Sequence, residues 1–258
     1  MAFRNIDFAH LAKFNSASSS EFIEFYENLV TSKIAECSDR LPSKTFAPSS
    51  VRCQRKSWFR LRGVSPDILK QPDLTLEFSA EIGTACHRII QNNLKSALGE
   101  DWIAVKDFLA ANPIPFVYTL TESDDGLETK VEIEDPPVRF ACDGIIRWKG
   151  KLYLLEIKTS EYSSFNDLTD AKPIHLDQIK CYATLLGISD VLVLYQDRQY
   201  GNLKCYELHI SDADKSKIMA DFKHVQYMAS ANLAPDRLDR SDYMCVNCEY
   251  RKKCGDWG

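Results

Sequence analysis

The chain has 258 residues, of which 45% are apolar and 27% are charged, and its 37 acidic and 32 basic residues give a net charge of −5. This composition excludes disordered and collagen-like chains and is typical of a globular domain that buries one core. No stretch approaches the roughly 18 unbroken apolar residues of a membrane span, and the N-terminus lacks the apolar core of a signal peptide. We therefore expect a soluble, cytoplasmic protein with no membrane partner.

The basic residues are unevenly distributed along the chain. Five of them lie between positions 52 and 62 without an acidic residue, and Arg251, Lys252 and Lys253 lie near the C-terminus. Basic stretches are often solvated helix faces. Here both adjoin cysteines, and the odd number of nine cysteines does not indicate a disulfide framework. Some of the cysteines are therefore candidates for metal ligation.

The first half of the chain is predicted to be mainly helical. Residues 18–21 have the spacing of a capping box, and apolar residues follow at helical spacing up to Ile34. Ser49 or Ser50 is expected to cap a second helix that carries Cys53. A third helix is predicted over 79–98, with His87 on its apolar stripe and Gly99 as a C-cap.

The second half alternates between strands and helices. From about residue 131 strands are expected, and the apolar segments 138–148 and 151–159 are predicted to form a hairpin at Lys149 and Gly150. A helix over 174–186, strands over 190–196 and 203–210, and a last helix over 213–233 follow. Residues 236–243 are expected to form a polar linker. This order predicts an α/β fold with a mixed central sheet flanked by helices.

The predicted hairpin brings two acidic residues together. If Lys149 and Gly150 form a two-residue turn, Trp148 pairs with Lys151 and Asp143 faces Glu156. Carboxylates so opposed repel each other, and a hard divalent cation would turn that repulsion into a binding site. Strand alternation also places Lys158 on the face of Glu156. The alternative is an ordinary hairpin whose charged side chains face solvent.

A carboxylate pair on a metal with a nearby ammonium suits one kind of chemistry. The metal can lower the pKa of a water molecule, and the ammonium can stabilise a pentavalent phosphate. The arrangement therefore indicates hydrolysis of phosphodiester bonds by a metal-dependent hydrolase.

Four motifs extend this pattern. They are Gly83-Thr-Ala-Cys-His87, Cys142-Asp143-Gly-Ile, Glu156-Ile-Lys158 and Gln178-Ile-Lys-Cys-Tyr182. In the order of these motifs along the chain, roughly residues 50–258 resemble the RecB-like branch of the PD-(D/E)XK nucleases. The resemblance implies a restriction-endonuclease-like fold, an N-terminal helix and linker over 1–50, and a nuclease domain over 51–258.

The same resemblance implies roles for individual residues. His87, Asp143, Glu156 and the backbone carbonyl of Ile157 would bind Mn²⁺ or Mg²⁺, and Lys158 would be the catalytic lysine. Gln178 and Tyr182 would support the catalytic site and contact DNA.

Several points stay open at the level of sequence. Tyr182 also fits the apolar stripe of its helix, and an isolated histidine such as His87 is commonly a core residue. Relatives often have a glycine and a small residue before the aspartate, where this chain has Ala141 and Cys142. Either Glu132 or Glu134 could be a further site residue.

The C-terminus carries three closely spaced cysteines. Cys245, Cys248 and Cys254 form a C-x2-C-x5-C pattern, and a metal or cluster usually has four thiolate ligands. A fourth must come from Cys37, Cys53, Cys86, Cys142, Cys181 or Cys205. Zinc usually takes a second, closely spaced cysteine pair, and the chain has none.

Cys53, in the sequence Ser49-Ser-Val-Arg-Cys53, resembles the first cysteine of iron-sulfur RecB-like nucleases, which include the AddB nuclease domain and the CRISPR-associated single-domain exonucleases. The resemblance implies a 4Fe-4S cluster on Cys53, Cys245, Cys248 and Cys254. Zinc in the same cage is the alternative. The other five cysteines are interpreted as small buried residues.

Such a cluster would join the two basic stretches into one positive surface. Arg52, Arg55, Lys56 and Arg60 are then expected to contact DNA phosphates, and Trp58, Phe59 or Tyr250 to stack on bases. We expect a metal-dependent exonuclease that prefers single-stranded DNA ends and acts in recombination, repair, or CRISPR or phage DNA processing, within a host cytoplasm if phage-encoded. No phosphate-binding loop occurs, so a helicase or other partner would be a separate protein. The alternative is a non-cleaving DNA-binding or scaffold protein.

Overall fold

The computed structural model describes residues 17–38, 43–67, 74–246 and 248–256, apart from the side chains of 17–19, 33–38 and 256. By their contacts the residues divide into two compact units, Met1–Arg40 with Leu69–Ala80, and Leu41–Ile68 with Glu81–Gly258. The first unit contains the predicted N-terminal helix, α2 (Ala17–Ser38), and the start of α4 (Leu74–Leu98). The second unit contains both sheets. This division differs from a boundary at residue 50, which stays a prediction about domains.

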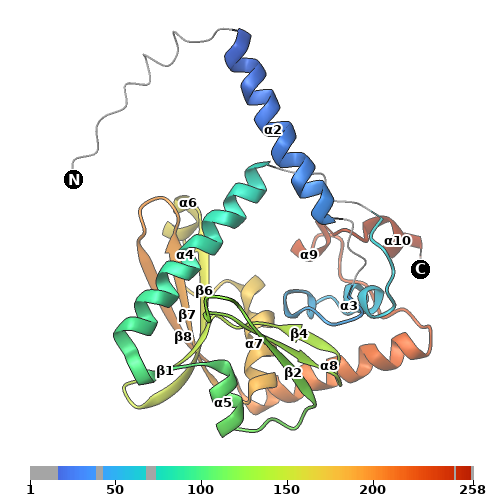
Figure 1. The fold of residues 1–258 in the computed structure, drawn as a ribbon. Helices are drawn as coiled ribbons and strands as arrows, with labels where there is room; N and C mark the ends of the chain where they lie inside the picture. The colour runs from blue at the N-terminus through green and yellow to red at the C-terminus, as the bar shows by residue number, and fades with distance from the viewer. Residues whose placement is uncertain (1–16, 39–42, 68–73, 247, 257–258) are drawn as a thin grey trace. The chain divides into compact units, whose positions relative to one another are not determined.

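The second unit is built around a five-stranded mixed sheet (Figure 1). Its strands, in spatial order, are β1 (Trp102–Ile103), β5 (Gly144–Trp148), β6 (Lys151–Ser160), β7 (Asp190–Asp197) and β8 (Leu203–His209). The pair β6 and β7 is parallel, and the other neighbours are antiparallel. The predicted α/β class with a mixed central sheet is confirmed.

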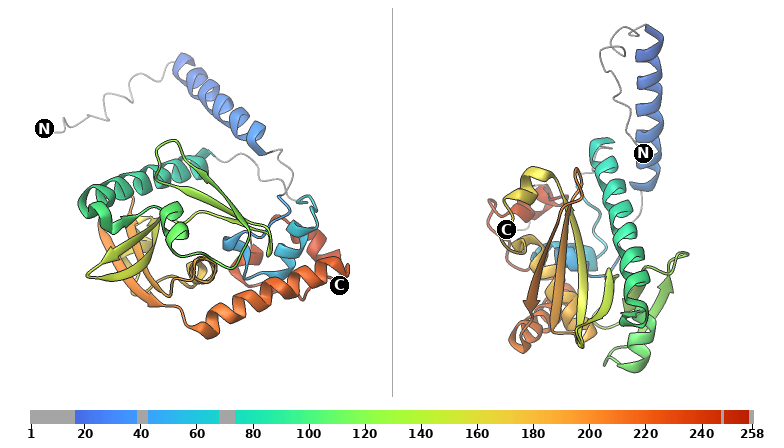
Figure 2. Two further views of the ribbon diagram at one scale, coloured as in Figure 1. Left: turned by 60° about the horizontal axis from the view of Figure 1, so that its bottom comes forward. Right: turned by 90° about the vertical axis from the view of Figure 1, so that its left-hand side faces the viewer.

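Helices cover both faces of this sheet. Ile90 of α4 packs with Leu155 and Ile157 on one face, and Figure 2 shows the part of α4 that belongs to the second unit lying beside the strands. On the other face α7 (Pro173–Leu186) contributes Ile179 and other apolar residues to the main core, beside α8 (Asp212–Ser230). Strand β6 is therefore covered on both sides, which is why it is an almost continuous apolar run. The α7 helix ends at Gly187 as expected, with φ of 72°.

A second, three-stranded sheet corrects one prediction. It contains β2 (Tyr118–Glu122), β3 (Thr129–Ile133) and β4 (Val138–Phe140). The segment 138–148 is thus two strands in two sheets, not one strand. Its apolar residues pack into the core from both sheets, so their hydrophobic pattern hides the break at residues 141–143.

Short elements complete the second unit. They are η2 (Pro48–Ser50), α3 (Gln54–Leu61), η3 (Gly99–Asp101), α5 (Val105–Ala111), α6 (Tyr162–Asn166), α9 (Tyr243–Val246) and α10 (Arg251–Asp256). The expected cap at Ser49 or Ser50 is wrong, because those residues form the 3-10 turn and Cys53 caps α3. No helix in the described ranges is long and apolar enough to cross a membrane.

Candidate active site and four-cysteine cavity

The β5–β6 hairpin has the predicted register. Trp148 pairs with Lys151 and Gly144 with Leu155, around a turn in which Lys149 and Gly150 both have positive φ. The ladder ends at Gly144, however, so Asp143 is not a strand partner of Glu156 as expected. The chain bends there to change sheets. The Asp143 carboxylate turns towards β6, where Oδ2 accepts a hydrogen bond from the Ile157 amide at 2.6 Å.

Helix α4 holds Asp143 from the other side. Nδ1 of His87 lies 3.0 Å from Asp143 Oδ1, and one turn later the buried Gln91 side chain donates to the Asp143 carbonyl at 2.7 Å. Burial alone would lower the pKa of His87, but the hydrogen bond and charge of Asp143 outweigh it and raise that pKa. Gln91 was not identified from the sequence, although its spacing of four residues from His87 places both side chains on one face of the helix.

Glu156 is a buried acid beside these groups. Its side chain is 2% exposed, and Oε1 lies 2.6 Å from Nζ of Lys158. Burial and then the charge of Asp143 raise the pKa of Glu156 to about 7, although Lys158 acts in the opposite direction. A cation bound beside this side chain would stabilise its ionised form.

A hydrogen-bonded chain leads from Lys158 into α7. Nζ of Lys158 donates to Oε1 of Gln178 at 3.1 Å, and Nε2 of Gln178 lies 2.7 Å from the hydroxyl of Tyr182. Tyr182 is 5% exposed and its ring packs 5.5 Å from that of Phe140. Tyr182 thus both supports the polar chain and packs in the core.

His175, on the first turn of α7, was not identified from the sequence. Its Nδ1 lies 2.8 Å from the hydroxyl of the fully buried Tyr195, which also accepts a hydrogen bond from the Lys172 amide at 3.0 Å. In these contacts Nδ1 is the acceptor for the tyrosine proton, so Nε2 carries the imidazole proton. Burial and the charges of Lys158 and Lys172 lower the pKa of His175 to about 4, so it is neutral near pH 7. Lone polar residues give no periodic signal in a sequence.

The side chains of this site form hydrogen bonds and ion pairs with one another. Within the described part of the chain, no group of three or more His, Cys, Asp or Glu residues is placed to hold a metal ion as it stands. Asp143 is occupied by His87 and the Ile157 amide, and Glu156 by Lys158. The donor set nevertheless fits a hard divalent cation, because two interacting carboxylates and an imidazole meet at a site where burial disfavours unpaired negative charge.

The four cysteines predicted as ligands line one cavity. Cys53, Cys245, Cys248 and Cys254 surround a space of about 170 Å³, and no disulfide joins them. Cys53 caps α3 and accepts a hydrogen bond from the Lys56 amide at 3.4 Å, while the others come from the chain end. Burial raises the pKa of Cys53 to about 11 and also raises the pKa values of Cys245 and Cys248. Thiolates are the ligands that a zinc ion or an iron-sulfur cluster takes, although the described cysteines, as they stand, also form no group of three or more that is placed to hold a metal ion.

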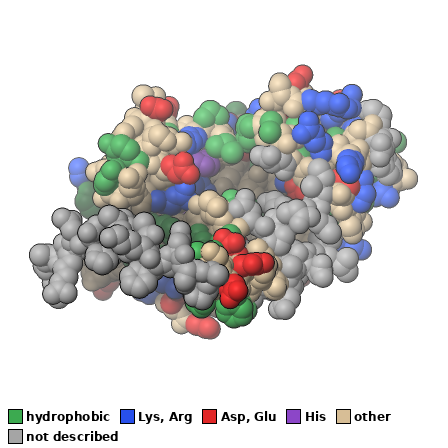
Figure 3. Space-filling model, turned by 90° about the horizontal axis from the view of Figure 1, so that it is seen from above, with side chains coloured by type: hydrophobic (Ala, Val, Ile, Leu, Met, Phe, Trp, Pro, Cys, Tyr) green, Lys and Arg blue, Asp and Glu red, His purple; other side chains and the backbone are tan. Residues whose placement is uncertain are grey.

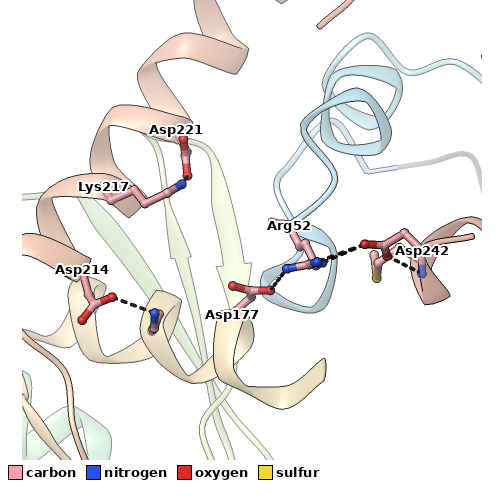
Figure 4. Close-up of polar contacts among 8 residues, drawn as sticks. Arg52, Asp177, Asp214, Lys217, Asp221 and Asp242 are labelled. Carbon is pink, nitrogen blue, oxygen red and sulfur yellow. Dashed lines mark hydrogen bonds and ion pairs between the residues drawn. The ribbon is translucent and has the colours of Figure 1, made fainter. Parts of the chain in front are cut away.

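The predicted phosphate-binding residues have internal partners. Arg52 lies between Asp177 of α7 at 3.7 Å and Asp242 at 3.0 Å (Figure 4). Lys56 pairs with Glu249 at 2.9 Å, and Arg60 lies 3.3 Å from the Ser43 hydroxyl. Arg55 is only 5% exposed, so a contact with DNA phosphate does not fit it.

The two basic stretches nevertheless meet. Arg55, Lys56 and Arg251 line the same cavity, and Figure 3 shows Lys and Arg side chains gathered on the side where α9 and α10 lie. The expected base stacking is wrong, because Trp58, Phe59 and Tyr250 are at most 1% exposed. Their rings belong to the core that fixes α3 to the chain end.

The remaining cysteines and acids have the following places. Cys142 and Cys181 are buried as expected, Cys86 is half-buried, Cys205 is exposed contrary to expectation, and the Cys37 side chain lies outside the described residues. Glu132 pairs with Arg139 at 2.9 Å on an exposed face of the small sheet, and Glu134 is exposed. The structure does not join either acid to the network around Asp143.

Comparison with known proteins gives limited similarity. No family model matches the chain, and no curated protein matches it. The solved structure of SSO0001 is 18% identical with a TM-score of 0.48, covering 92% of this chain and 98% of that one. An alkaline exonuclease, LHK-Exo from Laribacter hongkongensis, is 12% identical with a TM-score of 0.45, covering 74% of this chain and 90% of that one. A complex of LHK-Exo with dAMP gives similar values.

Proposed function

We propose that the chain is a metal-dependent deoxyribonuclease with a restriction-endonuclease-like fold, which hydrolyses phosphodiester bonds at single-stranded DNA ends. The observation that carries the proposal is the buried Glu156, whose pKa is raised to about 7 by burial and by Asp143 and whose oxygen contacts Lys158. Two interacting carboxylates in a buried place are unfavourable for stability. In a hydrolase the same pair forms a cation-binding site beside an ammonium group.

The residues that would hold the cation come from three segments. They are His87 of α4, Asp143 before β5, and Glu156 with the carbonyl of Ile157 in β6. When bound, Mg²⁺ or Mn²⁺ polarises a phosphoryl oxygen and lowers the pKa of a water molecule. The imidazole of His87 favours Mn²⁺ over Mg²⁺.

Other side chains orient this set and act on the substrate. Gln91 fixes the backbone of Asp143, and the Gln178–Tyr182 pair fixes the ammonium of Lys158. We assign to Lys158 the stabilisation of negative charge on the phosphate, because its Nζ is within hydrogen-bonding reach of the buried carboxylate.

The four-cysteine cavity is proposed to hold a 4Fe-4S cluster. Four thiols from segments about 190 residues apart in sequence converge there, so a cluster would tie α3 to the chain end. Anaerobically purified protein should absorb broadly near about 400 nm and lose that absorption in Cys248→Ser. Zinc without iron or sulfide after anaerobic purification would contradict this assignment.

The biological setting is part of the proposal. The substrate is DNA with a preference for single strands, and the proposed setting is recombination, repair, or CRISPR or phage DNA processing in a cell's cytoplasm. A separate helicase or recombination partner would supply any unwinding.

Release of nucleotides from end-labelled DNA tests the activity. We expect cleavage of single-stranded DNA with Mn²⁺, none with EDTA, and none by Glu156→Ala, which should still bind DNA. Glu207→Ala removes an exposed carboxylate of β8 that pairs with Lys151, and it serves as the control that cleaves normally. Binding without cleavage by the fully metallated wild-type protein would instead identify a non-cleaving DNA-binding protein.

A further inference from the structure

The Arg55 side chain joins three parts of the chain inside the protein. It lies on α3, two residues after Cys53, and is 5% exposed. Its Nε donates to the carbonyl of Pro235 at 2.6 Å and its Nη1 to the carbonyl of Cys254 at 3.1 Å. The guanidinium thus sits between the backbone of Pro235 and the backbone of Cys254, which is a predicted cluster ligand.

Among the side chains that the structure describes, no carboxylate is paired with Arg55, whose two hydrogen-bond acceptors are carbonyl groups. Its neighbours differ in this respect, because Arg52 pairs with Asp242 and Lys56 with Glu249. The two carbonyl groups satisfy hydrogen bonds but carry no net charge. A buried cation that lacks a counter-charge is destabilising, because it loses its hydration and gains no ion pair in return.

The cavity lined by the four cysteines is where a counter-charge to Arg55 could bind. Arg55 lines the cavity that the four cysteines surround, and the described lining of this cavity includes no acidic residue. Its other basic members are Lys56, Arg237, Arg240 and Arg251. Lys56 is paired with Glu249, but uncharged thiols would leave Arg55 without a counter-charge among the described residues. Four thiolates around an iron-sulfur core carry net negative charge.

We propose that Arg55 is a positioning residue for the iron-sulfur cluster, offsetting its negative charge from within the protein. This inference rests on the cluster proposed above. It assigns two effects to one side chain. Arg55 retains the cluster, and it raises the reduction potential, because a nearby fixed positive charge favours the state with one more electron.

Three variants separate charge from packing. Arg55→Gln removes the charge, Arg55→Lys keeps the charge but cannot make both carbonyl hydrogen bonds, and Arg251→Gln removes an exposed charge from the same cavity. Each protein is purified anaerobically as the full chain. Iron and sulfide content, the rate of iron loss to a chelator, and the midpoint potential in a titration with dithionite as electron donor are then measured.

We expect Arg55→Gln to lose iron roughly tenfold faster than wild type and to have a lower midpoint potential. Arg55→Lys should keep a potential near that of wild type while unfolding at a lower temperature, and Arg251→Gln should match wild type in both readouts. If Arg55→Gln loses iron at the wild-type rate and has the wild-type midpoint potential, the proposed role of Arg55 is wrong. If Arg55→Gln does not fold, a folded Arg55→Lys with a lowered potential overturns it. A wild-type protein without iron and sulfide overturns the cluster itself.

Discussion

The ammonium nitrogen of Lys158 lies 2.6 Å from a carboxylate oxygen of Glu156, a side chain that is 2% exposed. Through this contact Lys158 supplies positive charge to the buried acid. A divalent cation bound by Asp143 and Glu156 would compete for the same carboxylate and leave the ammonium available to a phosphate. Stability and activity at this site are therefore expected to change in opposite directions.

Glu156→Gln should stabilise the metal-free protein at alkaline pH and abolish cleavage. The pKa of Glu156 is raised from 4.5 to about 7, so wild type loses stability as pH rises from about 4.5 through 7. The shift corresponds to at most about 3 kcal/mol, reduced by the lost contact with Lys158. Thermal unfolding in EDTA at pH 5 and pH 8 measures this. A variant less stable than wild type at pH 8 would contradict it.

Affinity for Mn²⁺ should fall as pH decreases below about 7. Binding requires ionised Glu156 and neutral His87, and the pKa values of both groups are raised, so protons compete with the cation at both ligands. The expected loss is about tenfold per pH unit for each group that must release a proton. Calorimetric titration in buffers of different ionisation enthalpy counts the released protons. Affinity that is constant between pH 8 and pH 5.5 would exclude these ligands.

The chain from Lys158 to Tyr182 predicts graded effects on catalysis. Gln178→Ala removes the acceptor for Lys158, whereas Tyr182→Phe removes only the hydroxyl that contacts Gln178. We expect kcat to fall by about tenfold to a hundredfold in Gln178→Ala and less in Tyr182→Phe, with KM changing less than kcat. Steady-state cleavage of a short labelled strand provides both constants. A larger defect in Tyr182→Phe would show that its packing against Phe140 matters more.

Gly144→Ala should disturb the position of Asp143. A Cβ at residue 144 would lie 2.7 Å from the ring of Trp102, too close for an unshifted structure. The expected destabilisation is about 1 to 3 kcal/mol, with weaker Mn²⁺ binding. The additional change Trp102→Leu should restore part of both losses, because it opens the space. Gly255→Ala is the control, since its nearest neighbour is 3.9 Å away. Equal destabilisation by the two alanine variants would contradict the steric explanation.

The hairpin at the site was predictable because a two-residue turn with Lys149 and Gly150 fixes its register. The predicted strand pairing of Asp143 with Glu156 is wrong, because the chain changes sheets around Cys142 and the ladder ends at Gly144. Buried residues on both sides of that break give one unbroken apolar pattern, so the sequence does not show it. Local sequence does not show which side chains another segment covers. For this reason Phe59 was predicted to be accessible, although it stacks on Tyr250.

Crystals grown anaerobically with Mn²⁺ and measured at the manganese and iron absorption edges would locate both proposed metals. We expect a manganese peak within about 2.0 to 2.6 Å of carboxylate oxygens of Asp143 and Glu156, with the His87 imidazole and Ile157 carbonyl as further ligands. We also expect iron in the cavity of Cys53, Cys245, Cys248 and Cys254. If crystals at saturating Mn²⁺ show no metal at Asp143 and Glu156, and Lys158 still contacts Glu156, these carboxylates are not the cation site.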